Sequence, residues 1–454
     1  MQHTDKTYLR DLRTRIESGR DSELHEMLLP LHPADMAEVF DMLRPEEAEY
    51  LFRLLNPEIK SDVLIELEND VREGLLSTLT AAEIAGEVLE GLDSDDAADV
   101  MSDLPEEKAE EVIRLIEDDE QASDIRDLLN YPEGTAGALM AKELVQVHRD
   151  WTVNRAIREI RRQAAELDNV YTIYVVDDEE RLTGRLSLKH LLLSATTTRT
   201  KIEELQDQED IISVGAHEEG EKAVKLMERY DLVALPVLGP EGRLVGRITI
   251  DDAVDVIIEE SERDYQLASG ISEDVESRDS VWTLTRARLP WLLIGLGGGI
   301  GGAYVIGAFD LERNPGMALF IPLIAAMGGN VGVQSAAIVV QGLASSAIET
   351  ADLLGRLSKE LGVGIINGLI CSALILGSGV VLGFGTPLSV TVSLALLCVI
   401  IFAALFGTFV PLMLHRYKID PALATGPFIT TANDIIGLII YFAVGSAISG
   451  FIWT

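Results

Sequence analysis

Cysteine is scarce in this chain of 454 residues. Its two cysteines, Cys371 and Cys398, both lie in apolar runs, so they indicate neither a disulfide framework nor a thiolate metal site. Only seven histidines occur, and the sequence contains no cluster of histidine and cysteine. The candidate metal ligands are therefore oxygen atoms, which suit Mg²⁺, Ca²⁺ or Mn²⁺ better than Zn²⁺ or Cu⁺.

Motifs of enzyme active sites and export signals are also missing. The sequence contains no Walker loop and no Ser/His/Asp or Cys/His arrangement, so we expect no enzymatic activity. GGGIGG at 297–302 has dinucleotide-loop spacing, but it lies in an apolar run and predicts helix packing. The opening MQHTDKTYLRDLRTRIESGR is charged and has no apolar core, which predicts a first part that stays in the cytoplasm.

Positive charge is scarce relative to negative charge before Arg286. Residues 1–285 contain 68 acidic and 30 basic residues, whereas the remainder contains seven of each. The whole formal charge of −38 therefore belongs to the first part. Such a field repels nucleic acid and anionic lipid and attracts cations. We expect an acidic soluble part joined to a neutral membrane domain at 286–454, with no nucleic-acid partner.

Leucine or isoleucine recurs every twelve residues in the first 130 residues, with one step of thirteen. The repeat positions are Leu31, Leu43, Leu55, Leu67, Leu79, Leu92, Leu104, Ile116 and Leu128. Pro33, Pro45 and Pro57 each follow a repeat leucine by two positions, and proline is favoured in the first turn of a helix. The pattern predicts residues 1–130 as an all-α superhelical domain of short stacked helices.

Two acidic segments stand out in the soluble part. DSDDAAD places Asp95 and Asp99 one helical turn apart, where carboxylates repel unless they are solvated or bridged by a cation. A connecting helix is predicted over 250–285, and Asp252 and Asp255 follow helical spacing within it. Two acidic surfaces approach each other closely only if cations neutralise them. Solvated faces and a cation-bridged contact are both consistent with the pattern.

Residues 131–260 contain an internal repeat. TIYVVDDEERLTGRLSLKHLL matches ALPVLGPEGRLVGRITIDDAV at an offset of 62 residues. Each copy predicts strand, turn, strand and helix, and each follows another strand and helix. This α/β pattern resembles a tandem pair of CBS domains, with units at 131–198 and 199–260. The resemblance implies a ligand-sensing module without catalysis of its own.

In CBS domains an acidic residue after G-x-x-[ST] often contacts a nucleotide ribose. The second unit has Asp252 at that position, and the first has His190. The resemblance therefore implies an adenine nucleotide as a ligand of the pair, with Asp252 as a ribose contact.

Five apolar runs in the last part are each long enough to cross a hydrocarbon core of roughly 30 Å. They predict an all-α polytopic membrane domain with spans at 289–309, 317–343, 361–383, 388–414 and 423–451. Basic residues gather on one side of these spans, at Arg286, Arg288, Arg356, Lys359, Arg416 and Lys418, with Arg313 alone on the other. The positive-inside rule then places the N-terminal domains in the cytoplasm and the C-terminus outside, in a multi-pass protein of the cytoplasmic membrane.

Asp434 is the one carboxylate well inside a predicted span. It lies twelve residues into the fifth run, or roughly 18 Å along a helix at 1.5 Å per residue. An ionised carboxylate at mid-membrane costs on the order of 3 kcal/mol, so a functional role is the default interpretation. Thr430, Thr431 and Asn433 add oxygens. A bound cation satisfies Asp434, and so does a proton; Mg²⁺ fits best because it keeps its water shell.

A polar stripe lies inside the second predicted span, PLIAAMGGNVGVQSAAIVVQ. Asn330 and Gln334 share one helix face, Gln341 follows, and three glycines accompany them. Amides at membrane depth need a partner in protein, water or an ion. The stripe predicts either an amide-bonded helix contact or the lining of a pathway.

Together the motifs YPEGTAGALM, PLIAAMGGNVGVQS, DPALATGP and TTANDIIGLIIYF resemble an MgtE-type magnesium channel over essentially the whole chain. The resemblance implies a homodimer with a central pore, Asp434 as the ion-binding carboxylate, and Asn330, Thr430 and Thr431 near the pore. It also implies closure by intracellular Mg²⁺ bound to the cytoplasmic domains. The implied regulatory ligands are Asp95, Asp99, Glu219, Glu221, Asp231, Asp252, Asp255 and Glu260.

Two other transport mechanisms compete with a magnesium-importing channel. In a proton- or sodium-coupled divalent-cation carrier regulated by CBS domains, Asp434 serves as the proton site. An anion channel is disfavoured because no basic residue lies at membrane depth.

Overall fold

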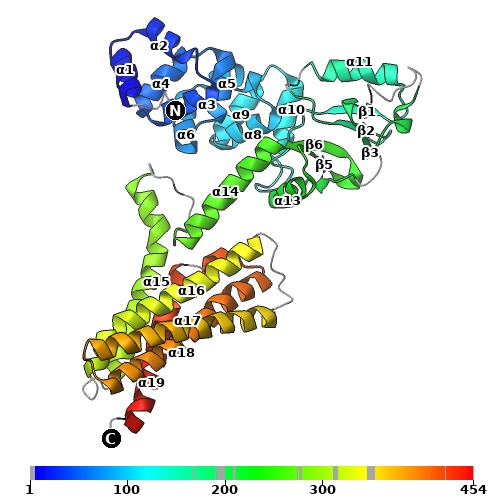
Figure 1. Ribbon diagram of the computed structural model, residues 1–454. Helices are drawn as coiled ribbons and strands as arrows, with labels where there is room; N and C mark the ends of the chain where they lie inside the picture. The colour runs from blue at the N-terminus through cyan, green and yellow to red at the C-terminus, as the bar shows by residue number, and fades with distance from the viewer. Residues whose placement is uncertain are drawn as a thin grey trace. The chain divides into compact units, whose positions relative to one another are not determined.

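The computed structural model of the protein forms two compact units, residues 1–258 and 259–454, which are described separately. It describes every residue except 1–5, 166, 168, 190, 192–199, 208–210, 273–274, 276–278, 310–314, 345–352, 425 and 453–454. The first unit is an array of short helices followed by two small sheets, and the second consists of long helices (Figure 1). His190 and Arg313 lie outside the described residues.

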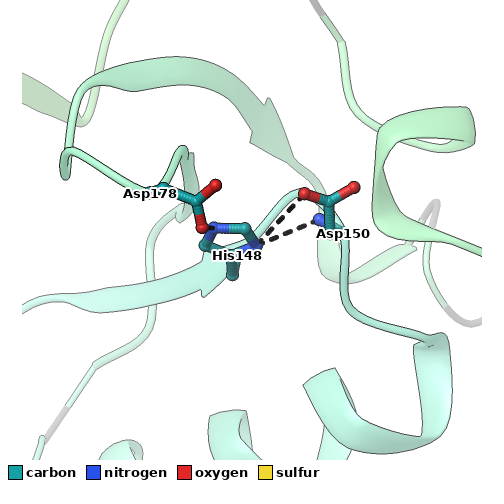
Figure 2. Close-up of side chains that lie close together, drawn as sticks. All are labelled: His148, Asp150 and Asp178. Atoms are coloured by element: carbon teal, nitrogen blue, oxygen red, sulfur yellow. Dashed lines mark hydrogen bonds and ion pairs between the residues drawn. The ribbon is translucent and has the colours of Figure 1, made fainter.

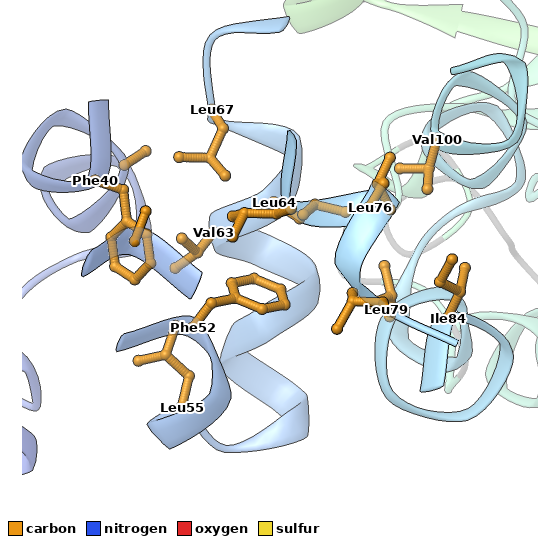
Figure 3. Close-up of a cluster of buried hydrophobic side chains, with 14 of the residues drawn as sticks. Phe40, Phe52, Leu55, Val63, Leu64, Leu67, Leu76, Leu79, Ile84 and Val100 are labelled. Carbon is orange, nitrogen blue, oxygen red and sulfur yellow. The ribbon is translucent and has the colours of Figure 1, made fainter. Parts of the chain in front are cut away.

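The N-terminal helices are short because the chain turns and restarts every twelve residues. Pro33, Pro45 and Pro57 each begin a helix, as predicted. The repeat positions before Leu128 face one core, in which Leu67 and Leu79 are buried (Figure 3). The helical N-terminal domain is thus confirmed. Its helices are α1 (Lys6–Glu17), α2 (Asp21–Leu28), α3 (Pro33–Asp41), α4 (Pro45–Leu54), α5 (Pro57–Ile65), α6 (Asn69–Thr78), α7 (Ala81–Glu83), α8 (Ser94–Ser102), α9 (Glu106–Leu115) and α10 (Asp119–Leu128).

The thirteen-residue step in the repeat, from Leu79 to Leu92, coincides with a π turn. α7 continues into a π-helical turn, η1 (Ile84–Val88), and then a 3₁₀ turn, η2 (Leu89–Gly91). A π turn accommodates an extra residue within a helix. The insertion is absorbed locally, and Leu92 returns to the buried face.

The internal repeat folds into two three-stranded sheets of the same topology. The strands are β1 (Val145–His148), β2 (Ile173–Val176) and β3 (Leu182–Leu186) in one sheet, and β4 (Val214–Gly215), β5 (Ala234–Leu238) and β6 (Leu244–Thr249) in the other. In each sheet the first pair of strands is parallel and the second antiparallel. Helix α11 (Val153–Gln163) joins β1 to β2, and α13 (Gly220–Tyr230) joins β4 to β5. The α/β tandem pair is confirmed.

The register of the two sheets follows the alignment of the repeats. Val175 lies opposite Gly184 in the first sheet, and Val237 lies opposite Gly246 in the second. Neither glycine has room for a side chain. A Cβ at Gly246, for example, would meet the Ala141 carbonyl oxygen at 2.7 Å. The repeated glycine is therefore explained by close packing within each sheet.

The connecting helix is shorter than the predicted 250–285. Helix α14 (Ile250–Ala268) follows β6 directly and ends before Gly270, which has a φ of +79°. The next helix begins at Val281, earlier than the first predicted span.

Five helices of the second unit are long and apolar enough to cross a membrane, as predicted. They are α15 (Val281–Ala308), α16 (Ile321–Ala344), α17 (Leu353–Val381), α18 (Thr386–Arg416) and α19 (Pro427–Ile452). The most buried is α18, which packs against α16, α17 and α19. The Tyr441 hydroxyl of α19 donates to the Met317 carbonyl at 2.9 Å, and this bond fixes α19 near the start of α16.

Candidate ion-binding sites

The first acidic group lies where α8 of the helical array meets α14. Asp95 and Asp96 stand in the first turn of α8, and Asp252 stands in the first turn of α14. Ala98 and Leu128 of the array share an apolar core with the second sheet, and this core holds α8 in place. Asp95 and Asp252, which the sequence places in two separate acidic segments, are close enough for the charge of Asp252 to raise the pKa of Asp95.

Burial is the main cause of the raised pKa of all three carboxyl groups. It raises the pKa of Asp95 well above its ordinary range, and the negative charge of Asp252 is the next cause. Burial, followed by the charge of Asp252, raises the pKa of Asp96 to about 7. The pKa of Asp252 is raised to about 6 by burial, although hydrogen bonds from the Thr249 N–H (2.9 Å) and hydroxyl (2.7 Å) oppose the shift. Such a group requires protons or a cation to compensate its charge.

A second carboxylate set adjoins the first at the N-terminus of α8. Asp93, Asp95 and Glu143 each offer an oxygen atom, and these atoms lie within 4.8 Å of one another. Glu143 accepts hydrogen bonds from the Ser94 N–H at 3.1 Å and the Ser94 hydroxyl at 2.8 Å. Sequence reasoning missed Glu143 because it lies far from α8 along the chain and has no acidic neighbour of its own.

Two of the other predicted regulatory residues lie at the edge of the acidic group. Asp99 is exposed on α8, and its charge contributes to the raised pKa of Asp96. Asp255 is exposed on α14, and its pKa is raised by burial and then by the charge of Asp251. Asp96, which the sequence did not single out, is thus more central than Asp99.

The remaining predicted regulatory residues are dispersed. Glu219 precedes α13 and is exposed, and Glu221 forms an ion pair with Lys225 one turn later. Asp231 follows α13 in the left-handed region, with a φ of +51°. Glu260 is exposed on α14. The described contacts do not bring these four residues together.

A cluster in the first sheet, which the sequence did not indicate, joins His148, Asp150 and Asp178 (Figure 2). The Asp150 N–H donates to His148 Nδ1 at 3.2 Å, and His148 Nε2 lies 3.0 Å from the Asp178 carboxylate without the alignment of a hydrogen bond. Lys201 Nζ lies 3.4 Å from Asp150 and competes for its charge. These contacts stabilise the end of β1, and we assign no ion to the cluster.

A cavity of about 190 Å³ lies between the two copies of the repeat. Tyr174 and Arg185 line it from the first copy, and Asp231 and Pro236 line it from the second. The Tyr174 hydroxyl is buried and has no hydrogen-bond partner among the described residues. Asp252, expected as a ribose contact, lies outside this lining and accepts a hydrogen bond from the Thr249 N–H.

In the membrane unit, Asp434 faces the glycines of α16. A Cβ added at Gly329 would lie 3.6 Å from Asp434 Oδ1 and 3.2 Å from Thr430 Cγ2. Thr430 shares this face, but its hydroxyl donates to the Gly426 carbonyl at 3.0 Å. Thr431 points elsewhere, since its methyl group occupies the space above Gly298 of α15.

Asp434 lies nearer to the start of its helix than predicted. Because α19 begins at Pro427, Asp434 lies only seven residues along the helix, or about 10 Å at 1.5 Å per residue. On α16, Asn330, Gln334 and Gln341 are exposed in the single protomer, whereas the glycines face α19. The amide stripe and the glycine stripe thus occupy different faces of one helix.

A second carboxylate lies inside a membrane helix. Glu360 belongs to α17, which begins at Leu353 rather than at the predicted 361, and it accepts a 2.6 Å hydrogen bond from the buried Ser335 hydroxyl of α16. Sequence reasoning missed this residue because the basic residues Arg356 and Lys359 lie beside it. Basic residues at that position predict the end of a span.

The end of α14 contacts the beginning of α19. A Cβ at Gly426 would collide with the Ala268 carbonyl oxygen, and a Cβ at Gly270 would lie 2.6 Å from Pro427 Cγ and 3.6 Å from Trp291 Cβ. Both glycines also have positive φ, +54° and +79°. The connecting helix therefore ends directly against the helix that bears Asp434.

The donors gathered around α8 and at Asp434 are oxygens, and five described helices can cross a membrane. Together with the paired α/β repeat they define the class of protein, a cation transporter with a pair of CBS domains. Family models agree: "divalent cation transporter" matches residues 321–444, "MgtE intracellular N domain" matches 31–134, and "CBS domain" matches 136–195 and 202–259. The chain belongs to the MgtE family.

Two relatives named magnesium transporter MgtE match almost the full length. The Bacillus subtilis protein is 31% identical over 437 residues, covering 95% of each chain. The Thermus thermophilus protein is 33% identical over 440 residues, covering 95% of this chain and 96% of its own. The cytosolic domain of the Mg²⁺ channel MgtE, solved in complex with ATP, is 33% identical with a TM-score of 0.50, and the match covers 55% of this chain and 99% of that one.

Proposed function

We propose that this chain imports Mg²⁺ across the cytoplasmic membrane as a magnesium-selective channel, and that intracellular Mg²⁺ closes it through the acidic cytoplasmic domains. The observation that carries the proposal is Asp434, a carboxylate within a membrane helix that packs against glycines of α16. The full-length likeness to named magnesium transporters supports Mg²⁺ as the ion. Mg²⁺ keeps its water shell, which suits a site with one carboxylate per chain.

The working form is a homodimer whose pore is lined by α16 and α19 of both protomers. Asn330 and Gln334 support this arrangement, because amides exposed on one protomer at membrane depth need a polar surrounding. Asn330 and Thr430 contribute to the path beside Asp434. Lipid covers the outward apolar face of α17, and the C-terminus lies outside.

Regulatory Mg²⁺ binds between α8 and α14. Asp95, Asp96 and Asp252 are the principal ligands, and their raised pKa values support a strong demand for positive charge. Asp93 and Glu143 supply further oxygens to the same region. Asp99 and Asp255 assist at its edge.

An adenine nucleotide binds the CBS pair in the cavity next to Tyr174 and Pro236. The ATP complex of a relative's cytosolic domain supports this ligand. The unpaired Tyr174 hydroxyl and the Arg185 guanidinium are polar groups suited to a nucleotide.

Mg²⁺ flux into liposomes containing the purified protein tests the proposed function. We expect flux that is driven by the Mg²⁺ gradient and a reversal potential set by that gradient alone. A reversal potential that shifts with pH or Na⁺ would instead establish the alternative, a proton- or sodium-coupled carrier. Absence of Mg²⁺ flux from folded protein at low internal Mg²⁺ would refute both.

A further inference from the structure

Asn433 is a buried amide with no hydrogen bond. The residue is 1% exposed, and neither Oδ1 nor Nδ2 has a hydrogen-bond partner among the described residues. Exchanging the amide oxygen and nitrogen does not remove the mismatch, because both ends lack a partner. A buried polar atom without a partner costs free energy, so the amide destabilises the arrangement in which it is seen.

The side chain of Asn433 packs against the glycine backbone of α16. The amide occupies the space that a side chain at Gly332 would take, and Gly332 in turn contacts Gly407 of α18. Asp434, the next residue, lies over Gly329. Asn433 and Asp434 therefore both lie against the row of glycines on α16.

Both polar atoms of the Asn433 amide are buried. Lipid, bulk water and a second protomer cannot reach them until α16 and α19 separate. An apolar side chain of similar size would remove the cost of the unpaired atoms. The amide is therefore explained by contacts that it makes in another state of the membrane unit.

We propose that Asn433 is a second ion-contacting residue of the permeation path, exposed when α16 and α19 separate. Its Oδ1 then accepts a hydrogen bond from the water shell of a divalent cation held at Asp434. A hydrated cation presents O–H donors, so a carbonyl oxygen is the complementary group. The inference rests on the proposed role of Asp434 in transport.

The first test compares Mg²⁺ flux of Asn433→Leu and Asn433→Ser with that of the unmodified protein in liposomes. We expect Asn433→Leu to lower flux by about tenfold or more, because a hydrogen bond to a charged partner is lost. Its melting temperature should stay equal or rise, whereas Asn433→Ser should keep more flux. Ser372→Ala is the matched control, since the buried Ser372 hydroxyl of α17 donates to the Ser393 carbonyl of α18 at 2.8 Å, so it belongs to the contact of α17 with α18.

The second test asks whether position 433 becomes exposed. In a chain whose Cys371 and Cys398 are replaced by alanine, Asn433→Cys is treated with a small cationic thiol reagent. We expect modification at low Mg²⁺ and protection at high Mg²⁺, while Ser372→Cys, buried between α17 and α18, stays unmodified in both conditions. The serine and leucine variants keep the inference testable if the cysteine variant does not fold.

The inference is overturned if Asn433→Leu transports like the unmodified protein, or if position 433 stays unmodified at low Mg²⁺. The parallel measurement on Asp434→Ala separates this result from failure of the proposed function. Flux that survives in Asp434→Ala refutes the proposed path itself. Flux that is lost in Asp434→Ala but normal in Asn433→Leu refutes only the role of Asn433.

Discussion

At the scale of the residue, proposed transport depends on the negative charge of Asp434. Asp434→Ala is expected to abolish Mg²⁺ flux while the protein remains folded and inserted, because it removes the carboxylate that faces Gly329 of α16. Asp434→Asn should fail too, since it keeps the shape and loses the charge. Liposome flux with purified variants measures both, and a conducting asparagine variant would show that the charge is not needed.

The acidic group between α8 and α14 predicts a pH dependence. The pKa of Asp96 is about 7 when α8 and α14 are together, against an ordinary 3.8. A raised pKa means that the docked arrangement binds the proton more tightly, so its stability increases as pH falls through 7. At pH well above 7, a difference of three pKa units lowers the stability of the docked arrangement by on the order of 4 kcal/mol.

Limited proteolysis of Mg²⁺-free protein from pH 8 to pH 6 measures this effect. Protection of the cytoplasmic part should increase as pH falls, and Asp96→Asn should flatten the dependence. Protection that increases with pH would contradict the assignment.

At the scale of the element, the junction of α14 and α19 depends on glycine. Gly426 has a φ of +54° and leaves no room for a Cβ beside the Ala268 carbonyl, so Gly426→Ala combines backbone strain with a collision. We expect a loss of about 1–3 kcal/mol in stability and weaker closure by Mg²⁺. Gly383→Ala is the matched control, because Gly383 has a similar φ of +78° but open space around it. Equal melting temperatures for the two variants would show that the contact with Ala268 is unimportant.

Periodic patterns in the sequence predict the elements well because each reports a local repeat. The twelve-residue leucine period predicts the helical array, the 62-residue offset predicts two equivalent sheets, and apolar runs predict five spans. Pairings between distant residues, such as Ser335 with Glu360 or Ser94 with Glu143, leave no such period. Charge alone therefore left a contact between the segments of Asp95 and Asp252 as one of two possibilities, and the sequence did not indicate Glu143 or the buried amide of Asn433.

At the scale of the whole molecule, the acidic soluble part provides the proposed feedback. Residues 1–285 contain 68 acidic and 30 basic residues, and α8 and α14 each contribute carboxylates to one buried group. Two unit charges about 4 Å apart repel by roughly 4 kcal/mol at an effective dielectric of 20. Bound Mg²⁺ removes this penalty only where α8 and α14 are together, so it favours the closed state, and several weak sites make the response steep.

The double variant Asp95→Asn, Asp252→Asn tests whether bridging by Mg²⁺ or repulsion alone controls closure. If bridging dominates, the Mg²⁺ needed for protease protection and for reduced flux should rise on the order of tenfold or more, because amides coordinate Mg²⁺ more weakly than carboxylates. If repulsion alone dominates, the variant should close without Mg²⁺. We expect the first result.

Glu106→Gln with Glu107→Gln is the matched control, since it removes the same charge from an exposed turn of α9. Identical protection of the unmodified protein with and without Mg²⁺ would refute gating by the cytoplasmic domains.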